Sequence, residues 1–182
     1  HPVFPGTGRS LFRSGRDRLI QIQIENIHLF QFLHIRYSIY LAGCSHHCVG
    51  CHNPESWNPS AGIPLTEDMI ANIIGEINGN PLLDGVTFSG GDPFFHPEEF
   101  LALVKRIKES TGQNIWCYTG YTFERLLDNP KQAELLKYID VLVDGKFKQA
   151  LRDESLLFRG SSNQRLIDVK ASLKANKLSC WN

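Results

Sequence analysis

The sequence predicts an α/β fold, an open partial (β/α) barrel with mostly parallel strands, for three reasons. Short apolar stretches typical of strands alternate with longer amphipathic stretches typical of helices, which is the pattern of a parallel sheet. The chain has 182 residues, whereas a closed eight-stranded barrel needs about 200 or more. Polar or glycine-rich corners follow four of the strand candidates, and such folds collect their ligands at the carboxyl ends of strands.

The amino-terminal part of the chain divides into an irregular arm and two strand candidates. Residues 1–18 contain four Arg, three Gly and two Pro without periodicity, so we expect a mobile arm before a single domain over residues 19–182. Apolar and polar residues nearly alternate over 19–27, which predicts a strand. A second strand is expected at 37–42, directly before a group of cysteines.

Three helical stretches follow. Thr66 is suited to cap a helix over 67–77, which Gly79 can end. Pro97 is suited to the first turn of the next helix. A third helical stretch is expected at 122–138, interrupted by an Asn-Pro pair.

Four further strands separate and follow these helices, and most of them end in a polar or glycine-rich corner. They are expected at 86–88, at 115–118, at 141–143 and near 166–169, with a polar tail after the last. The corners after strands are the cysteine group, Gly90-Gly91-Asp92, Thr119-Gly120 and Asp144-Gly145. Because parallel strands end at one edge of a sheet, we expect these corners to converge on one rim.

Composition narrows the class of protein. Nineteen basic and nineteen acidic side chains balance, so the clustered excess of Lys and Arg typical of nucleic-acid binding is missing. No stretch approaches the roughly 18 apolar residues of a membrane span, and no signal-peptide core is present. Five cysteines, three of them close together, favour a reducing cytoplasm and a metal site over disulfides.

The cysteines Cys44, Cys48 and Cys51 are spaced C-x3-C-x2-C. Three thiolates spaced this way can hold three irons of a four-iron cluster and leave the fourth iron open for a ligand that is not protein. Zinc is the alternative, because three neighbouring histidines offer a fourth ligand. Zinc sites usually take ligand pairs from two separated segments, however, and no second pair follows downstream.

The corner Gly90-Gly91-Asp92, followed by Pro, suggests a clamp for an amino-acid-like group. Its glycines allow backbone to approach a ligand closely, and its carboxylate can accept hydrogen bonds from an ammonium group. Alone, this sequence is also an ordinary strand-to-helix turn. On the same rim as a cluster with an open iron, it indicates a ligand site.

Together these motifs resemble the radical S-adenosylmethionine superfamily. Three longer segments, 43–55, 141–147 and 158–164, narrow the resemblance to the anaerobic ribonucleoside-triphosphate reductase activating proteins, which are small glycyl-radical activases. The resemblance covers roughly residues 36–169. It implies a partial barrel of the radical S-adenosylmethionine type.

The resemblance also implies the cofactors and partners. A [4Fe–4S] cluster receives one electron from a flavodoxin-like donor and cleaves S-adenosylmethionine to methionine and a 5′-deoxyadenosyl radical. That radical takes a hydrogen atom from a glycine of the large subunit of the anaerobic ribonucleoside-triphosphate reductase. The alternatives are an activase of another glycyl-radical enzyme, or a non-catalytic iron–sulfur or zinc-binding protein.

Site residues carry over by position. Cys44, Cys48 and Cys51 match the cluster ligands, and Gly90, Gly91 and Asp92 match the segment that lines the methionine moiety. Gly50 and His52 match positions on the adenine side, and Asp144 is a candidate for the cofactor's polar groups. Residues 159–164 are suited to contact either the cofactor or the partner.

One stretch departs from the family. Its members usually carry an Asp-Gly-Pro-Gly turn shortly before the cysteine-bearing strand, but residues 28–35 here contain neither Gly nor Pro. Such an apolar, aromatic stretch is not suited to the same tight turn. Either divergence of this chain or a local sequence error explains the departure. The family pattern resumes cleanly at Arg36, which favours the sequence error.

Overall fold

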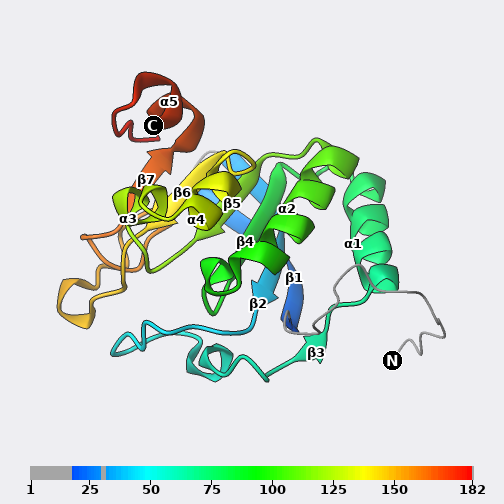
Figure 1. Cartoon of the computed structure of the whole chain (residues 1–182), viewed down its shortest axis with the longest axis horizontal. Helices are drawn as coiled ribbons and strands as arrows, with labels where there is room; N and C mark the ends of the chain where they lie inside the picture. Colours follow the sequence, from blue (N-terminus) through cyan, green and yellow to red (C-terminus); the bar gives the residue numbers. More distant parts are fainter. Residues whose placement is uncertain (1–17, 30–31, 182) are drawn as a thin grey trace.

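The computed structural model describes residues 18–29 and 32–181, with side chains from Ile35 onward, and contains one seven-stranded sheet (Figure 1). The strands are β1 (Arg18–Leu29), β2 (Phe32–Leu41), β3 (Ile63–Pro64), β4 (Gly85–Gly90), β5 (Ile115–Tyr118), β6 (Val141–Asp144) and β7 (Arg165–Asp168). Their order across the sheet is β3-β1-β2-β4-β5-β6-β7. The central pairs β2–β4, β4–β5 and β5–β6 are parallel, while β1 and β7 run antiparallel to their neighbours. The fold is therefore mixed α/β, with a mostly parallel sheet that is not closed within the described chain.

In the part of the chain that the structure describes, five α-helices follow or separate these strands. They are α1 (Glu67–Gly79), α2 (Pro97–Thr111), α3 (Phe123–Leu127), α4 (Pro130–Leu136) and α5 (Val169–Ala175). The Thr66 side chain accepts from the Met69 N–H and caps α1, and Pro97 begins α2, as the sequence predicts. The predicted helix over 122–138 is divided in two, because Asn129 caps a new helix that starts at Pro130.

The helices cover one face of the sheet and form the core with it. Tyr37, Phe88 and Cys117, from three neighbouring strands, are fully buried toward this face. Phe88 packs edge-on against Phe100 of α2, with ring centroids 5.0 Å apart. Figure 1 shows α1 and α2 side by side on this face. The core thus fixes the strand ends from which the candidate site is built.

The opposite face carries polar side chains near the start of the central strands. The buried Arg36 donates from Nε to the Thr87 hydroxyl at 2.9 Å, and its guanidinium lies 4.9 Å from the centroid of the Trp116 ring. Burial is the main reason why the pKa of Arg36 falls to about 10. These residues lie at the end of the strands that is remote from the cysteines.

The prediction that an irregular polar tail directly follows the last strand is wrong, because a helix comes first. The expected strand near 166–169 ends at Asp168, and Val169 begins α5. The Asp168 side chain caps this helix by accepting from the Ala171 N–H at 2.8 Å, and Val169 and Ser172 are buried beneath it. The sequence does not predict this helix, because only two of its residues are buried and the apolar periodicity of a helix is therefore weak.

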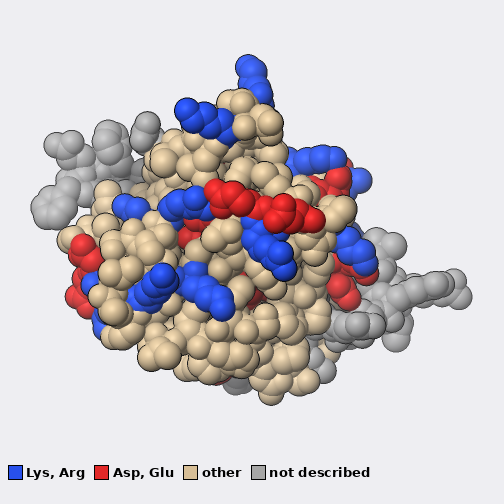
Figure 2. Space-filling model, turned by 60° about the vertical axis from the view of Figure 1, so that its left-hand side comes forward, with Lys and Arg blue, Asp and Glu red and all other residues tan. Residues whose placement is uncertain are grey.

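The departing stretch 28–35 lies mostly in two antiparallel strands, with Leu29 opposite Phe32. The two residues between them, and residues 1–17 of the arm expected at 1–18, lie outside the described residues. Arg18, the last residue of that expected arm, is the first residue of β1. No helix of the described chain is long and apolar enough to cross a membrane. Figure 2 shows Lys and Arg interspersed with Asp and Glu on the face it presents.

Candidate functional site

A cavity of about 260 Å³ lies at the carboxyl ends of the parallel strands. All four predicted corners reach it, which follows from the shared direction of β2, β4, β5 and β6. Its lining includes residues of the cysteine loop, of the strand corners and of two later loops: Cys44, His46, Cys48, Cys51, His52, Asn53, Trp57, Ser89, Gly90, Gly91, Tyr118, Thr119, Gly120, Gly145, Phe147, Gly160 and Gln164.

The loop after β2 places all three cysteines on this cavity. Its start is held by backbone hydrogen bonds from Gly43 N–H to the Ser56 carbonyl at 2.8 Å and from Cys44 N–H to the Trp57 carbonyl at 3.2 Å. A tight turn follows, in which the Cys51 N–H donates to the Cys48 carbonyl at 3.1 Å. These backbone hydrogen bonds fix the path of the loop around the three cysteines.

The chemistry of this donor set fits an iron–sulfur cluster. Burial is the main cause that raises the pKa of both Cys44 and Cys48, so bound iron has to displace thiol protons. Among the described residues, no three His, Cys, Asp or Glu side chains converge as ligands for a single metal ion. A four-iron cluster does not require such convergence, because each thiolate binds a different iron.

The corner after β4 lies directly against the cysteine loop. A Cβ atom on Gly91 would lie 2.4 Å from the Gly43 carbonyl oxygen and 2.9 Å from that of Ser56. The Gly91 N–H donates to the Leu41 carbonyl at 2.7 Å, and the Asp92 N–H to the Gly43 carbonyl at 2.8 Å. Gly91 is needed because protein backbone approaches it, in addition to any ligand in the cavity.

Asp92 lies beneath the cavity rather than on its lining. Its side chain is buried and accepts hydrogen bonds from the Thr119 hydroxyl at 2.9 and 3.0 Å, from Gly120 N–H at 2.9 Å and from Phe94 N–H at 2.9 Å. The His46 Nε2 atom lies 2.7 Å from the same carboxylate. A direct contact of this carboxylate with a cofactor ammonium group therefore remains a prediction.

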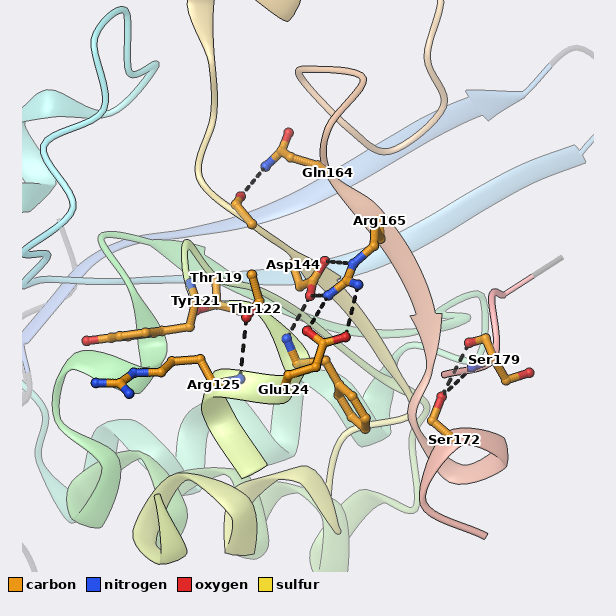
Figure 3. Close-up of polar contacts among 12 residues, drawn as sticks. Thr119, Tyr121, Thr122, Glu124, Arg125, Asp144, Gln164, Arg165, Ser172 and Ser179 are labelled. Carbon is orange, nitrogen blue, oxygen red and sulfur yellow. Dashed lines mark hydrogen bonds and ion pairs between the residues drawn. The ribbon is translucent and has the colours of Figure 1, made fainter. Parts of the chain in front are cut away.

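Asp144 is also buried, and its carboxylate binds protein groups (Figure 3). It accepts from Arg165 Nε at 2.9 Å and Nη2 at 2.5 Å, and from the Phe123 N–H at 2.7 Å. Glu124 completes the cluster by accepting from Arg165 at 3.0 and 2.8 Å. Asp144 thus joins the start of α3 to β7, while its neighbour Gly145 reaches the cavity. Its predicted contact with the cofactor stays a prediction.

Of the remaining predicted residues, His52, Gly160 and Gln164 line the cavity, whereas Gly50 is not part of its lining. His52 lines it, and its ring lies 5.6 Å from that of Phe147. Gly50 lies against the side chains of Phe147 and Gln149. In the segment 159–164, Gln164 lines the cavity and donates to the Gly145 carbonyl at 3.1 Å (Figure 3).

The sequence interpretation missed some of the lining residues. Trp57 lines the cavity, although a Trp in a loop after the cysteines is as well explained by packing. Tyr118 lines it because it is the last residue of β5 and points away from the helix-covered face. His46 is one of the three neighbouring histidines that the sequence offers as a zinc ligand. Its place inside the cysteine motif was the available signal for a role beside the cluster.

Comparisons with known proteins agree with this site. A family model described as a 4Fe-4S single cluster domain matches residues 34–167. The anaerobic ribonucleoside-triphosphate reductase-activating protein of Escherichia coli K12 is 43% identical over 134 residues, which cover 71% of this chain and 85% of that protein. The proteins of the same name from Pasteurella multocida and Enterobacteria phage T4 are 42% and 37% identical, covering 71% and 72% of this chain and 84% and 82% of the relatives.

The match to the solved structure of QueE from Escherichia coli covers 58% of this chain and 54% of the QueE chain, with 16% identity and a TM-score of 0.44. This likeness is too distant to bear on function. The family model spans the cysteine loop and every corner of the cavity, and these relatives match 71% of the chain. The chain therefore belongs to the family of anaerobic ribonucleoside-triphosphate reductase-activating proteins, with a 4Fe-4S single cluster domain.

Proposed function

We propose that this chain is a radical S-adenosylmethionine enzyme that generates a glycyl radical on the large subunit of an anaerobic ribonucleoside-triphosphate reductase. The observation that carries the proposal is the cavity that three cysteines of one loop share with the glycine corners of β4 and β5. The relatives' shared name supports the choice of partner.

Cys44, Cys48 and Cys51 hold a [4Fe–4S] cluster in this proposal. When bound to these thiolates, the cluster would supply the single electron needed to cleave S-adenosylmethionine to methionine and a 5′-deoxyadenosyl radical, and this radical would take the hydrogen atom from the reductase glycine. Gly90 and Gly91 line the methionine side of the cavity with backbone. Gly50 and His52 border the adenine side.

The chain's own task is to position the reactants and to exclude water. Asp92 and Asp144 contribute by holding the β5 and β6 corners in place, through the Thr119 hydroxyl and through Arg165. Residues 19–182 act as one domain with the partial-barrel fold of the superfamily. The electron donor is flavodoxin-like, and the protein works in the cytoplasm.

Reconstitution with iron and sulfide under anaerobic conditions tests the enzymatic part. After addition of S-adenosylmethionine and dithionite, the proposal predicts methionine and 5′-deoxyadenosine in equal amounts. Cys180→Ser is the control for replacement of a cluster cysteine such as Cys48, and it should behave as the parent does, because Cys180 is exposed in the carboxyl-terminal segment. A protein that binds iron and sulfide yet releases no 5′-deoxyadenosine would be a non-catalytic iron–sulfur protein, and one colourless metal ion per chain would indicate zinc.

A further inference from the structure

A buried pair of side chains ties the cysteine loop to the corner after β4. The His46 Nε2 atom lies 2.7 Å from Asp92 Oδ2, and the two side chains are 8% and 1% exposed. The residues are 46 positions apart in the chain. Since Asp92 already accepts from the Thr119 hydroxyl and from Gly120 N–H, the imidazole adds the cysteine loop to a network that spans two strand corners.

The His46 ring is confined by its neighbours as well as by this hydrogen bond. A Cβ atom on Gly120 would lie 2.3 Å from His46 Cδ2, so only a glycine leaves room for the ring. On another side the ring meets Tyr121 edge-on, with centroids 4.5 Å apart. The side chain therefore occupies a fitted slot between the two corners.

The backbone of His46 contacts a cluster ligand. Its N–H points to the Cys44 sulfur, with nitrogen and sulfur 3.5 Å apart. Hydrogen bonds to ligand sulfurs are among the features that set the reduction potential of an iron–sulfur cluster. The backbone of His46 thus contacts the first cysteine, while its ring contacts Asp92 in the corner after β4.

We infer that His46 is a positioning residue: held by Asp92, it fixes the Cys44 turn and its N–H···S bond, and thereby the cluster's reduction potential and placement over the cavity. Asp92 then acts on the cofactor through His46 and the Thr119–Gly120 corner instead of by direct contact. The inference rests on the proposed function in that it assumes a cluster on these cysteines.

The direct-clamp interpretation makes the opposite prediction for His46. If Asp92 binds the cofactor's ammonium group, His46→Ala frees the carboxylate and leaves cofactor affinity equal or higher. If His46 positions the loop, then His46→Ala and Asp92→Asn damage the same contact. Their effects should then have the same direction and should not add in the double variant.

The experiment compares the reconstituted parent with His46→Ala, Asp92→Asn, the double variant and His47→Asn. His47 is the matched control, because it is the adjacent residue, is exposed, and faces Trp57 instead of Asp92. Asn suits its positive φ of 47°. The reduction potential and the paramagnetic resonance spectrum of the reduced cluster are recorded without S-adenosylmethionine, and the dissociation constant of S-adenosylmethionine is measured separately.

We expect both single variants to shift the reduction potential in the same direction and to weaken cofactor binding roughly tenfold. The double variant should shift no further than the larger single one, and His47→Asn should match the parent. Cluster loss in His46→Ala alone would also support the inference, and His46→Gln, whose amide can donate to Asp92, should then restore loading.

An unchanged potential and spectrum in His46→Ala, with weakened cofactor binding only in Asp92→Asn, would overturn the inference in favour of the clamp. The proposed function fails separately. If the parent cluster does not cleave S-adenosylmethionine, that function is wrong, whereas the potentials measured without this cofactor still decide the role of His46.

Discussion

Gly91→Ala tests the contact on which the whole site is built. The added methyl group would lie 2.4 Å from the Gly43 oxygen, 2.8 Å from the Gly43 carbonyl carbon and 2.9 Å from the Ser56 oxygen. All three are backbone atoms, so no flexible side chain can yield. Overpacking of this kind costs about 1–3 kcal/mol, and weakening the neighbouring hydrogen bond from Asp92 N–H to the Gly43 carbonyl adds about 1 kcal/mol. We expect the free energy of unfolding to fall by about 3 kcal/mol.

Urea unfolding of the metal-free protein under reducing conditions measures this loss. Gly75→Ala is the matched control, because Gly75 is exposed in α1 and an added Cβ would meet no atom within 4 Å. Replacing a glycine inside a helix should raise the free energy of unfolding by about 0.5–1 kcal/mol. A Gly91→Ala variant that unfolds at the parent's urea midpoint would refute the reasoning, since the two loops would then have room to part at no cost.

Three further predictions concern cysteines and one partly buried ion pair. Cys48→Ser should abolish the iron and sulfide content after reconstitution, whereas a fully loaded variant would exclude this thiolate as a ligand. Cys117, fully buried with a pKa raised by burial, should resist alkylation in the folded protein while the exposed Cys180 reacts, and equal labelling of the two by mass spectrometry would contradict the packing. Burial alone would raise the pKa of Asp140, but hydrogen bonds, including one of 2.7 Å from the Lys108 ammonium, outweigh it and hold that pKa below the usual carboxyl value. A carboxyl group whose pKa is lowered by folding stabilises the protein above its unfolded pKa, and this stabilisation is lost in acid. Lys108→Met should therefore lower the free energy of unfolding by about 1 kcal/mol at neutral pH and by progressively less below about pH 4. A difference in urea midpoint that stays constant into acid would contradict this.

The fold was predictable where local signals and tertiary packing agree. The strand Ile115–Tyr118 and the start of α2 at Pro97 follow from an apolar run and from proline's place in a first helical turn. Helix α5 was missed because its stability depends on the buried Val169 and Ser172 and on the Asp168 cap, which a polar sequence does not reveal.

The candidate site was predictable in its residues but less so in their roles. The spacing of Cys44, Cys48 and Cys51 is local, and their common cavity follows from the strand ends. The partners of Asp92 come from distant segments, since His46 and Thr119 lie 46 and 27 positions away. A Gly-Gly-Asp corner has the same sequence whether its carboxylate faces a ligand or its own protein. Only the folded arrangement distinguishes these two cases.

Electron paramagnetic resonance of the reductase tests the central claim most directly. The reconstituted protein is incubated anaerobically with S-adenosylmethionine, a reductant and the large subunit of the anaerobic ribonucleoside-triphosphate reductase. The proposed function predicts a glycyl-radical doublet on that subunit, which loses its splitting when the subunit's glycines are deuterated and is absent with Cys48→Ser. Release of 5′-deoxyadenosine without any radical on the reductase would contradict it and point to a different target.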